Sequence, residues 1–320
     1  MLSLCPPLAA QTAITAATFG PVVNNADQNK YTTPAVTYLE TSQALSTFTT
    51  AGGVYSVQNM ATNAYIRRNA VNANNSSVWY NGAATTALNG QYKATLNEVL
   101  LNNNVYMGTD NTFDNGAANT TGNIERLDFA WNAGIQIGLT DGFAVFERGA
   151  ANGHDAFSIA VITGWDSVNN KPTTYSKQLS QAAAWGATNI TTMANFQILR
   201  FGTGDALTND TAVTAGTAQG LGGLMFTLQD FGLAANTTIY GYSIMEYRAA
   251  PVAAGALLAD WTNTTYYPTN SAPGVDLSGI NGLMFSKTPE PSTYGALLVG
   301  ATAGLLGWRR HRRRVSARAA

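Results

Sequence analysis

The C-terminal part of the chain consists of three unlike segments in a fixed order, and the middle one can adopt only one conformation in lipid. A short polar motif comes first, an almost wholly apolar or small run from 295 to 308 follows, and an arginine cluster comes last. Inside a hydrocarbon layer every backbone N–H and C=O must bond within the segment, so the uncharged run is predicted to be a helix. From Ser292 to Trp308 it has roughly 17 residues and a length of about 25 Å, the low end of what crosses a bilayer core. The sequence therefore predicts one short transmembrane helix.

The residues that follow this helix predict its orientation. Trp308 suits the membrane interface, and basic residues beside a membrane segment stay on the cytoplasmic side. The cluster consists of Arg309, Arg310, Arg312, Arg313 and Arg314. Everything before Pro289 is therefore predicted to lie outside the inner membrane, and residues 315–320 to form a cytoplasmic tail. A basic tail can also bind nucleic acid, but the uncharged apolar run beside it disfavours that interpretation.

Small residues recur along one face of the predicted helix. Gly300 and Gly304 form a G-x-x-x-G pair, and Ala296 extends the same face by one turn. Small residues at this spacing let a second helix approach closely, which suits docking against another membrane protein. Glycine is also common in membrane helices in general, so both interpretations stay open.

Residues 288–314 resemble the PEP-CTERM sorting signal of Gram-negative bacteria. The resemblance depends on Pro289, Glu290, Pro291, Ser292 and Thr293, followed by the apolar run and the arginine cluster. It implies that an exosortase, an intramembrane transpeptidase-like enzyme, recognises and removes this tail, often in organisms that make exopolysaccharide. The precursor is then expected in the inner membrane, and the mature form at the cell surface or outside the cell. The extension 315–320 departs from the family, which usually ends sooner.

The portion before the tail is poor in charge and mildly acidic. Charged residues make up 11% of the chain, against a usual quarter. Six of the 17 Lys and Arg lie in the tail, but only one of the 18 Asp and Glu. Nucleic acid is not expected as a partner, since phosphate binding needs a clustered basic surface. Cys5 is the single cysteine, which excludes an intrachain disulfide and makes a thiolate metal site implausible.

Residues 1–20 are interpreted as the remnant of a signal and cleavage region. Export needs a basic n-region and an apolar h-region, and residues 1–11 contain neither. The stretch 8–11 has the small residues typical of the end of a cleavage site. We therefore expect the translation start to lie upstream or the segment to have been trimmed.

Residues 21–287 are predicted to form one all-β extracytoplasmic domain. Short runs of alternating apolar and polar residues recur between clusters of Gly, Asn, Asp and Thr, as in strands with one buried face. Many short strands without a repeat of fixed period favour an antiparallel, jelly-roll-like β-sandwich over a parallel β-helix. Short helices are predicted at 178–185 and 253–261. The predicted strands are 36–39, 54–60, 92–96, 105–107, 127–131, 135–139, 143–146, 157–162, 196–201, 224–228 and 239–245.

Residues with catalytic potential are few, and no catalytic residue is assigned. His154 is the only histidine before the tail, it lies in a Gly- and Asn-rich turn, and no G-x-S-x-G motif is present, so a loop role is expected. A glycosidase needs two carboxyl groups facing one cleft, whereas buried acids more often pair with arginine for structural reasons. The available carboxyl groups are those of Glu125, Asp128, Glu147, Asp155 and Asp166.

Two kinds of binding site are considered. Asp110 and Asp114 offer oxygens for calcium in an Asn-rich loop, but the loop departs from the EF-hand pattern and turn formation explains the same residues. No cofactor or metal is therefore assigned. The aromatic pairs Trp79–Tyr80 and Tyr266–Tyr267 are expected at the surface, because adjacent strand residues cannot both point inward. Their rings would suit the sugars of an exopolysaccharide.

These features predict an exported, exosortase-processed protein of the cell surface or extracellular matrix with a structural, adhesive or glycan-binding role. It is not expected to be an enzyme. The alternative is a secreted hydrolase that acts on polysaccharide through two of the five carboxyl groups. Turnover abolished by substitution of Glu125 or Glu147 would favour the hydrolase.

Overall fold

The computed structural model divides the chain into two compact units, Met1–Ser286 and Lys287–Ala320. It describes residues 11–21, 23–24, 41–42, 44–68, 97, 100–101, 124–148, 154–186, 190–193, 199–201, 207–209, 219–253, 255–267, 281–289, 302–303, 305 and 308.

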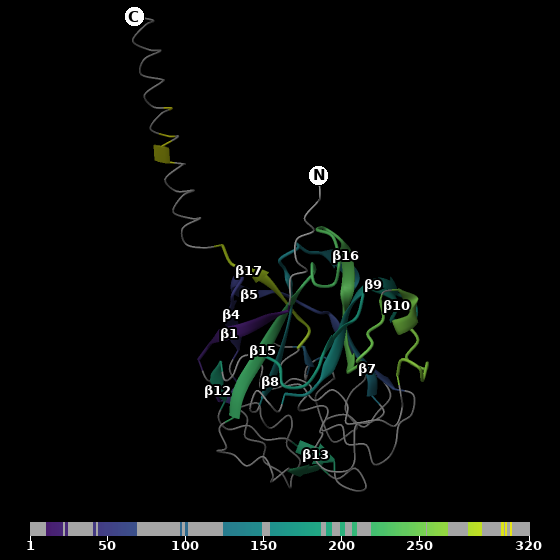
Figure 1. Cartoon of the computed structure of the whole chain (residues 1–320). Coiled ribbons are helices and arrows are strands. Elements are labelled where there is room, and N and C mark those ends of the chain that lie inside the picture. The colour runs from purple at the N-terminus through teal and green to yellow at the C-terminus, as the bar shows by residue number, and fades with distance from the viewer. Residues whose placement is uncertain are drawn as a thin grey trace, which may run out of the picture. The chain divides into compact units, whose positions relative to one another are not determined.

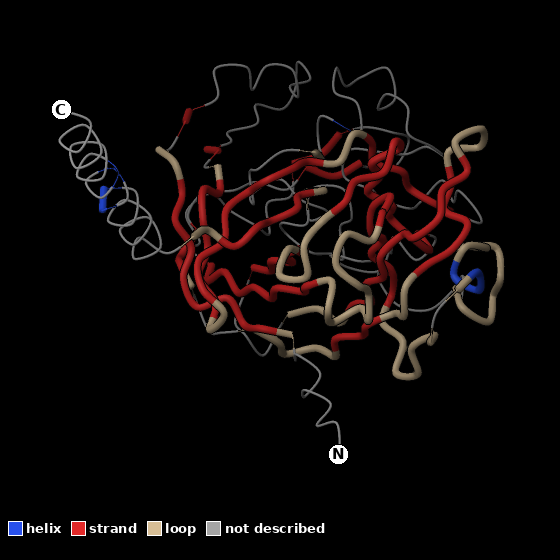
Figure 2. Tube along the Cα trace, turned by 90° about the horizontal axis from the view of Figure 1, so that it is seen from above, coloured by secondary structure: helices blue, strands red, loops and turns tan. Residues whose placement is uncertain are grey.

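The first unit is all-β and mostly antiparallel, as the sequence predicts (Figure 1). Helical structure is confined there, among the described residues, to Asn97, Leu100 and the 3-10 helix η4 (Ala256–Leu258), the short blue helix within a loop in Figure 2. The strands are β1 (Thr12–Phe19), β2 (Val23–Asn24), β3 (Thr41–Ser42), β4 (Leu45–Thr50), β5 (Gly53–Met60), β6 (Asn63–Arg68), β7 (Ile124–Gln136), β8 (Gly142–Arg148), β9 (Phe157–Asp166), β10 (Lys171–Tyr175), β11 (Leu179–Gln181), β12 (Thr191–Met193), β13 (Leu199–Phe201), β14 (Leu207–Asn209), β15 (Gln219–Thr227), β16 (Thr238–Glu246) and β17 (Leu283–Lys287).

The first of the two large sheets has the order β1-β4-β5-β17-β8-β15-β12. Strand β1 pairs with β4 and also with β15, so six of these strands close into a ring. Strands β8 and β15 pair over seven residues and run side by side in Figure 1. Residues 143–147 of β8 are all buried, which explains why this stretch shows little apolar–polar alternation.

The second large sheet has the order β10-β9-β16-β7-β6, and β11 also pairs with β9. Its inner face carries Leu127 and Phe129 of β7 together with Tyr242 and Ile244 of β16, all of which belong to the main core. Its outer face, the one turned away from that core, carries Arg126 and the other polar side chains described below. Both faces of the sheet are buried at β7, unlike the strands with one buried face that the sequence predicts.

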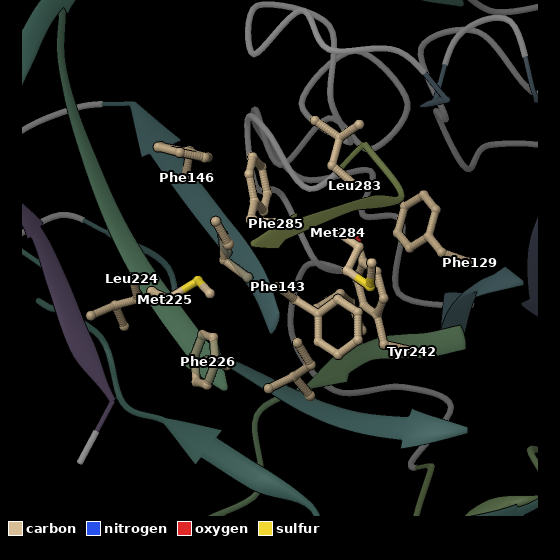
Figure 3. Close-up of a cluster of buried hydrophobic side chains, with 14 of the residues drawn as sticks. Phe129, Phe143, Phe146, Leu224, Met225, Phe226, Tyr242, Leu283, Met284 and Phe285 are labelled. Carbon is tan, nitrogen blue, oxygen red and sulfur yellow. The ribbon is translucent and has the colours of Figure 1, made fainter. Parts of the chain in front are cut away.

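One hydrophobic core contains side chains from both large sheets. The ring of Phe143 lies with its centroid 4.4 Å from that of Tyr242, and the two rings face each other in Figure 3. The ring centroid of Phe226 in the first sheet likewise lies 5.8 Å from that of Phe157 in the second. Burial of each such large side chain stabilises the fold by roughly 1.5–3 kcal/mol, so the contacts between the sheets hold the unit together.

Strand β7 contains a bulge in which residues 131–134 stand opposite Tyr240 of β16. Gly134 and Gly241 take positive φ there, 72° and 143°. A Cβ on Gly241 would lie 1.9 Å from the carbonyl oxygen of Phe129, so only glycine fits this close approach. The strand predicted at 127–131 is confirmed, but that at 135–139 is not a separate strand: residues 135–136 continue the bulged strand β7, 137–138 lie outside it and 139–140 form a turn.

Both helices predicted in this unit are wrong. Strand β11 replaces the helix expected at 178–185, because the backbone there pairs with β9. Ala184 and Gly186 follow with positive φ, which is incompatible with a right-handed helix. Among the described residues of 253–261 only η4 is helical, and the N–H and C=O of Gly255 just before it bond to Tyr175 of β10.

Other predicted strands give mixed outcomes. Strands β5, β8, β9, β15 and β16 lie where the sequence predicts them, within a few residues at each end. The predicted strand at 196–201 is described only as β13, and those at 36–39, 92–96 and 105–107 lie outside the described residues.

Little of the C-terminal tail is described. Thr288 and Pro289 directly follow β17, and Thr302, Ala303, Leu305 and Trp308 are helical. No helix within the described residues is long and apolar enough to span a membrane. The remaining sorting-signal residues lie outside the described part of the chain: Glu290, Pro291, Ser292, Thr293, Ala296, Gly300, Gly304, Arg309, Arg310, Arg312, Arg313 and Arg314.

Candidate functional site: a buried ion pair beneath an aromatic surface

Arg126 and Asp128 form a buried ion pair on the outer face of β7. The two residues are two positions apart in a strand, so their side chains emerge on the same face. Arg126 Nε lies 2.6 Å from Asp128 Oδ1, and Arg126 Nη2 lies 3.1 Å from Asp128 Oδ2. Neither side chain is exposed to solvent. Two parallel N–H···O bonds fix both the distance and the plane of the pair.

Asp128 also accepts hydrogen bonds from two neighbouring strands. Arg67 of β6 places Nε 2.9 Å from Oδ2, and Ser243 of β16 donates its hydroxyl to Oδ1 at 2.6 Å. Because the Ser243 proton is used in this way, the hydroxyl of Tyr175 on β10 donates to Ser243 Oγ at 2.9 Å. Side chains from four strands thus converge on one carboxylate.

Arg126 also binds the segment that covers the outer face of the second sheet, here called the covering segment (residues 251–253 and 255–267). Its Nη1 donates to the carbonyl oxygens of Leu258 at 2.5 Å and Ala259 at 3.2 Å. Tyr267 adds a bond from its hydroxyl to the Leu258 oxygen at 2.7 Å. These bonds satisfy carbonyls at the end of η4, which have no partner within the helix.

A second hydrophobic cluster lies between the covering segment and the sheet. Its buried members are Ala160, Ile162, Tyr175, Met245, Val252, Leu258 and Tyr267. The ion pair is therefore enclosed by apolar side chains, which explains why the polar positions of β7 are as buried as its apolar ones.

The surroundings set the ionisation of these groups. Burial alone would raise the pKa of Asp128, but the charges of Arg126 and Arg67 and the hydrogen bonds it accepts hold that pKa below its usual value. Burial alone would lower the pKa of Arg126, but the carboxylate of Asp128 outweighs it, so the guanidinium stays charged. Burial raises the pKa of Tyr175 well above its usual value, so its hydroxyl keeps its proton. A general acid needs a raised pKa, so Asp128 is unsuited to that role.

A partly exposed aromatic surface lies over this pair. The Arg67 guanidinium carbon lies 4.9 Å from the ring centroid of Tyr65 and 5.1 Å from that of Trp261, and Tyr65 lies 5.6 Å from Trp165. Asn132 Nδ2 lies 3.4 Å from the Tyr65 hydroxyl. We call this set, with Asn170, the outer aromatic surface: Tyr65, Arg67, Asn132, Trp165, Asn170 and Trp261. Its two tryptophans and Asn132 are partly exposed.

His154 lies elsewhere, in the first unit's main core. It is buried, its Nδ1 lies 2.6 Å from the Trp185 carbonyl oxygen, and its ring packs so closely on Gly222 that a Cβ there would lie 2.1 Å from Cε1. Burial lowers the pKa of His154, so the ring is neutral and Nδ1 carries the proton donated to Trp185. His154 lies outside regular structure, as predicted, but it is a packed side chain and not a free loop residue.

The carboxyl groups considered for hydrolysis lie on β7 and β8, just before β9 and at its end, and two of them are far apart. Asp155 precedes β9 and Asp166 ends it, so they are about 30 Å apart along the strand. Asp166 caps its own turn by accepting bonds from Val168 and Asn169. Glu147 is buried in β8 of the first sheet. Only the backbone of Glu125 is described.

The aromatic residues predicted to contact glycan differ from one another in burial, and two of them lie outside the described residues. Tyr267 is 3% exposed, so the prediction that it lies at the surface is wrong: residues 264–267 form turns that fold onto the sheet, and no strand alternation applies. Tyr266 is partly exposed, and its ring centroid lies 5.1 Å from the guanidinium carbon of Arg248. Trp79 and Tyr80 lie outside the described residues, as do Asp110 and Asp114. The described part of the chain contains no group of His, Cys, Asp or Glu side chains arranged to hold a metal ion.

No protein-family model, curated protein or solved structure matches this chain. The function must therefore be argued from the residues themselves.

Sequence reasoning missed most of this site. No sequence pattern links Arg67, Tyr175 and Ser243 to Asp128, because they lie on three other strands and only strand pairing brings them to it. One signal was available: Arg126 and Asp128 have opposite charges two positions apart in a strand, a spacing that places both side chains on the same face.

Proposed function

We propose that this protein is an exported, surface- or matrix-associated protein with a structural, adhesive or glycan-binding role, delivered as a membrane-tethered precursor. The observation that carries this proposal is the order of motif, apolar run and arginine cluster, which begins at Pro289, two residues after β17 ends at Lys287. The folded first unit therefore ends where the sorting signal starts. The apolar run is the transmembrane helix of the precursor, and the arginines hold its end at the cytoplasmic face.

Exosortase is the processing partner in this proposal, and Pro289, Glu290 and Pro291 are the recognition motif. The first unit is then released outside the inner membrane as a jelly-roll-like sandwich, with the two sheets packed through the shared core. The polar and aromatic outer face supports a binding role in an exopolysaccharide. Hydrolysis is not favoured, because Asp128 is tied to two arginines and Asp166 caps a turn.

The test replaces Pro289, Glu290 and Pro291 with alanine in the native organism. We expect the precursor to accumulate at its unprocessed size in the inner membrane and the surface form to disappear. A matched variant with alanine at Val315 and Ser316, beyond the arginine cluster, should be processed normally. Unchanged processing of the motif variant, or surface protein that still carries Arg309 to Arg314, would refute the proposal.

A further inference from the structure

The outer aromatic surface contains buried polar groups that the described protein leaves without partners. Asn132 Oδ1 and Trp165 Nε1 are both buried atoms without a hydrogen-bond partner. A buried donor or acceptor in this state costs roughly 1–3 kcal/mol, and such groups are rare in folded proteins. Asn132 and Trp165 both contact Tyr65, so the two unsatisfied groups belong to one small region.

The region combines these groups with the other features of a sugar site. Trp165 and Trp261 are partly exposed, and their flat faces suit the apolar face of a pyranose ring. An acceptor at Asn132 and a donor at Trp165 match hydroxyl groups, each of which both donates and accepts a hydrogen bond. Predominantly aromatic surroundings with a few placed polar groups are typical of small-molecule sites.

The charges around the surface decide which saccharide fits. Arg67 and Arg126 bind Asp128 directly, Lys171 stands opposite Asp166 in the register of β9 and β10, and the charges of Arg126 and Lys171 act on Asp260. Among these six described side chains, three positive and three negative charges balance. A balanced field gives no preference for an anionic polymer, so the ligand expected here is neutral.

One exposed side chain contacts Asn132. Asn132 Nδ2 lies 3.5 Å from Oδ1 of Asn170, at the limit of a hydrogen bond, and Asn170 is exposed on the turn 167–170. Asn170 has a φ of 49°, a conformation that glycine adopts without strain. A sugar hydroxyl that replaced the Asn170 side chain would accept a hydrogen bond from Asn132 Nδ2.

We infer that the outer aromatic surface binds a neutral polysaccharide through stacking on Trp165 and Trp261 and through hydrogen bonds to Asn132 and Trp165. The inference rests on the matrix role proposed above and names the ligand class and the residues for it. Asp128 takes no part in bond cleavage, so the site holds its ligand without turning it over.

The test is affinity electrophoresis of the full-length protein in gels that contain laminarin, dextran or hydroxyethyl cellulose, with alginate as the acidic comparison. We expect retardation in at least one neutral polymer. Trp165→Phe keeps an aromatic ring but removes the indole N–H, so binding should weaken roughly fivefold, the worth of one hydrogen bond. Its thermal midpoint should change little, because the packing that the smaller ring loses on the second hydrophobic cluster is offset by removal of a buried N–H without a partner. Asn170→Gly should bind at least as well as the natural protein.

Tyr247→Ala provides the matched control, because Tyr247 is exposed and lies outside the surface; it should bind normally. The inference is overturned if no neutral polymer retards the protein, if alginate alone does, if Trp165→Phe binds as tightly as the natural protein, or if Asn170→Gly loses binding. Each of these outcomes leaves the proposed export and processing standing, since those are judged by the fate of the Pro289 motif variant.

Discussion

Replacement of Asp128 by asparagine tests whether the buried ion pair holds the covering segment in place. The substitution keeps the shape of the side chain but leaves the fully buried Arg126 without its carboxylate, and it turns an N–H group toward one of the two guanidinium groups. Removal of one partner from a buried pair costs roughly 3–5 kcal/mol, about a fifth or more of the stability of a typical domain of about 5–15 kcal/mol. Arg67→Met removes a partner with 12% of its side chain accessible but leaves Asp128 bonded to Arg126, so the loss of its hydrogen bond should cost only about 1 kcal/mol.

The assay is urea unfolding of the purified protein followed by tryptophan fluorescence. With a slope of about 3 kcal/mol/M, Asp128→Asn should lower the midpoint by about 1 M or more, and Arg67→Met by about 0.3 M. The double substitution Arg126→Met with Asp128→Leu removes both buried charges and should lose less stability than Asp128→Asn alone, because apolar replacement of a whole pair is often neutral. A cost below about 1 kcal/mol for Asp128→Asn, or equal midpoints for Asp128→Asn and Arg67→Met, would refute the reasoning.

The pH dependence provides a second readout of the same residue. The pKa of Asp128 is lower in the folded protein than in the unfolded chain, so the unfolded chain takes up a proton first as the pH falls. The stabilisation is fully present above the unfolded pKa of about 3.9 and is lost as the pH falls through the lower folded pKa. The free energy of unfolding of Asp128→Asn should therefore fall less steeply below about pH 4 than that of the natural protein. Parallel curves would contradict the lowered pKa.

The remaining predictions concern packing and pH. The pKa of His154 in the folded protein lies below the ordinary 6.5. The free energy of unfolding should therefore fall as the pH drops below about 6.5, by at most about 1.4 kcal/mol per pH unit. His154→Gln should flatten that slope in urea titrations from pH 7 to 5. Gly142→Ala places a Cβ 1.8 Å from the carbonyl oxygen of Phe226 and should cost about 3 kcal/mol or more, whereas Gly20→Ala has room for the methyl group and should stay within about 0.5 kcal/mol in the same unfolding assay. Tyr267→Phe removes one bond to the covering segment and should cost about 1 kcal/mol; an unchanged midpoint would contradict that bond.

The parts of the fold that could be predicted are those determined by residues close together in the sequence. Strands β8 and β9 are dense in Phe, Ile and Val, and β16 in Ile, Tyr and Met; most of these residues are buried. The closure of the first sheet could not be read in this way, because it depends on β1 pairing with β15 some 200 residues later. The helices expected at 178–185 and 253–261 failed for a similar reason: short Ala- and Leu-containing stretches have helical propensity, but their backbone groups found partners on β9 and β10.

The alternation that identifies strand β7 does not indicate that its polar face is buried, so it does not predict the candidate site. Alternation in β7 correctly placed Leu127 and Phe129 on the inner face, and the same rule placed Arg126 and Asp128 on a face interpreted as polar. Nothing within β7 indicates that residues 255–267, more than a hundred positions later, cover that face. The sequence does contain the aromatic residues that enclose the pair, but only the tertiary structure brings Trp261 and Tyr267 to it.

Asp128 connects the two parts of the outer face, since it binds both the arginine that holds the covering segment and the arginine that lies between the surface rings. Arg126 contacts the Leu258 carbonyl, whereas Arg67 stacks between Tyr65 and Trp261. A buried ion pair adds little net stability compared with apolar side chains of the same volume, so stability alone does not account for two arginines on one carboxylate. The position of the arginines accounts for them: because side chains of β16 and β10 fix Asp128, both guanidinium groups are held where the covering segment meets the outer aromatic surface.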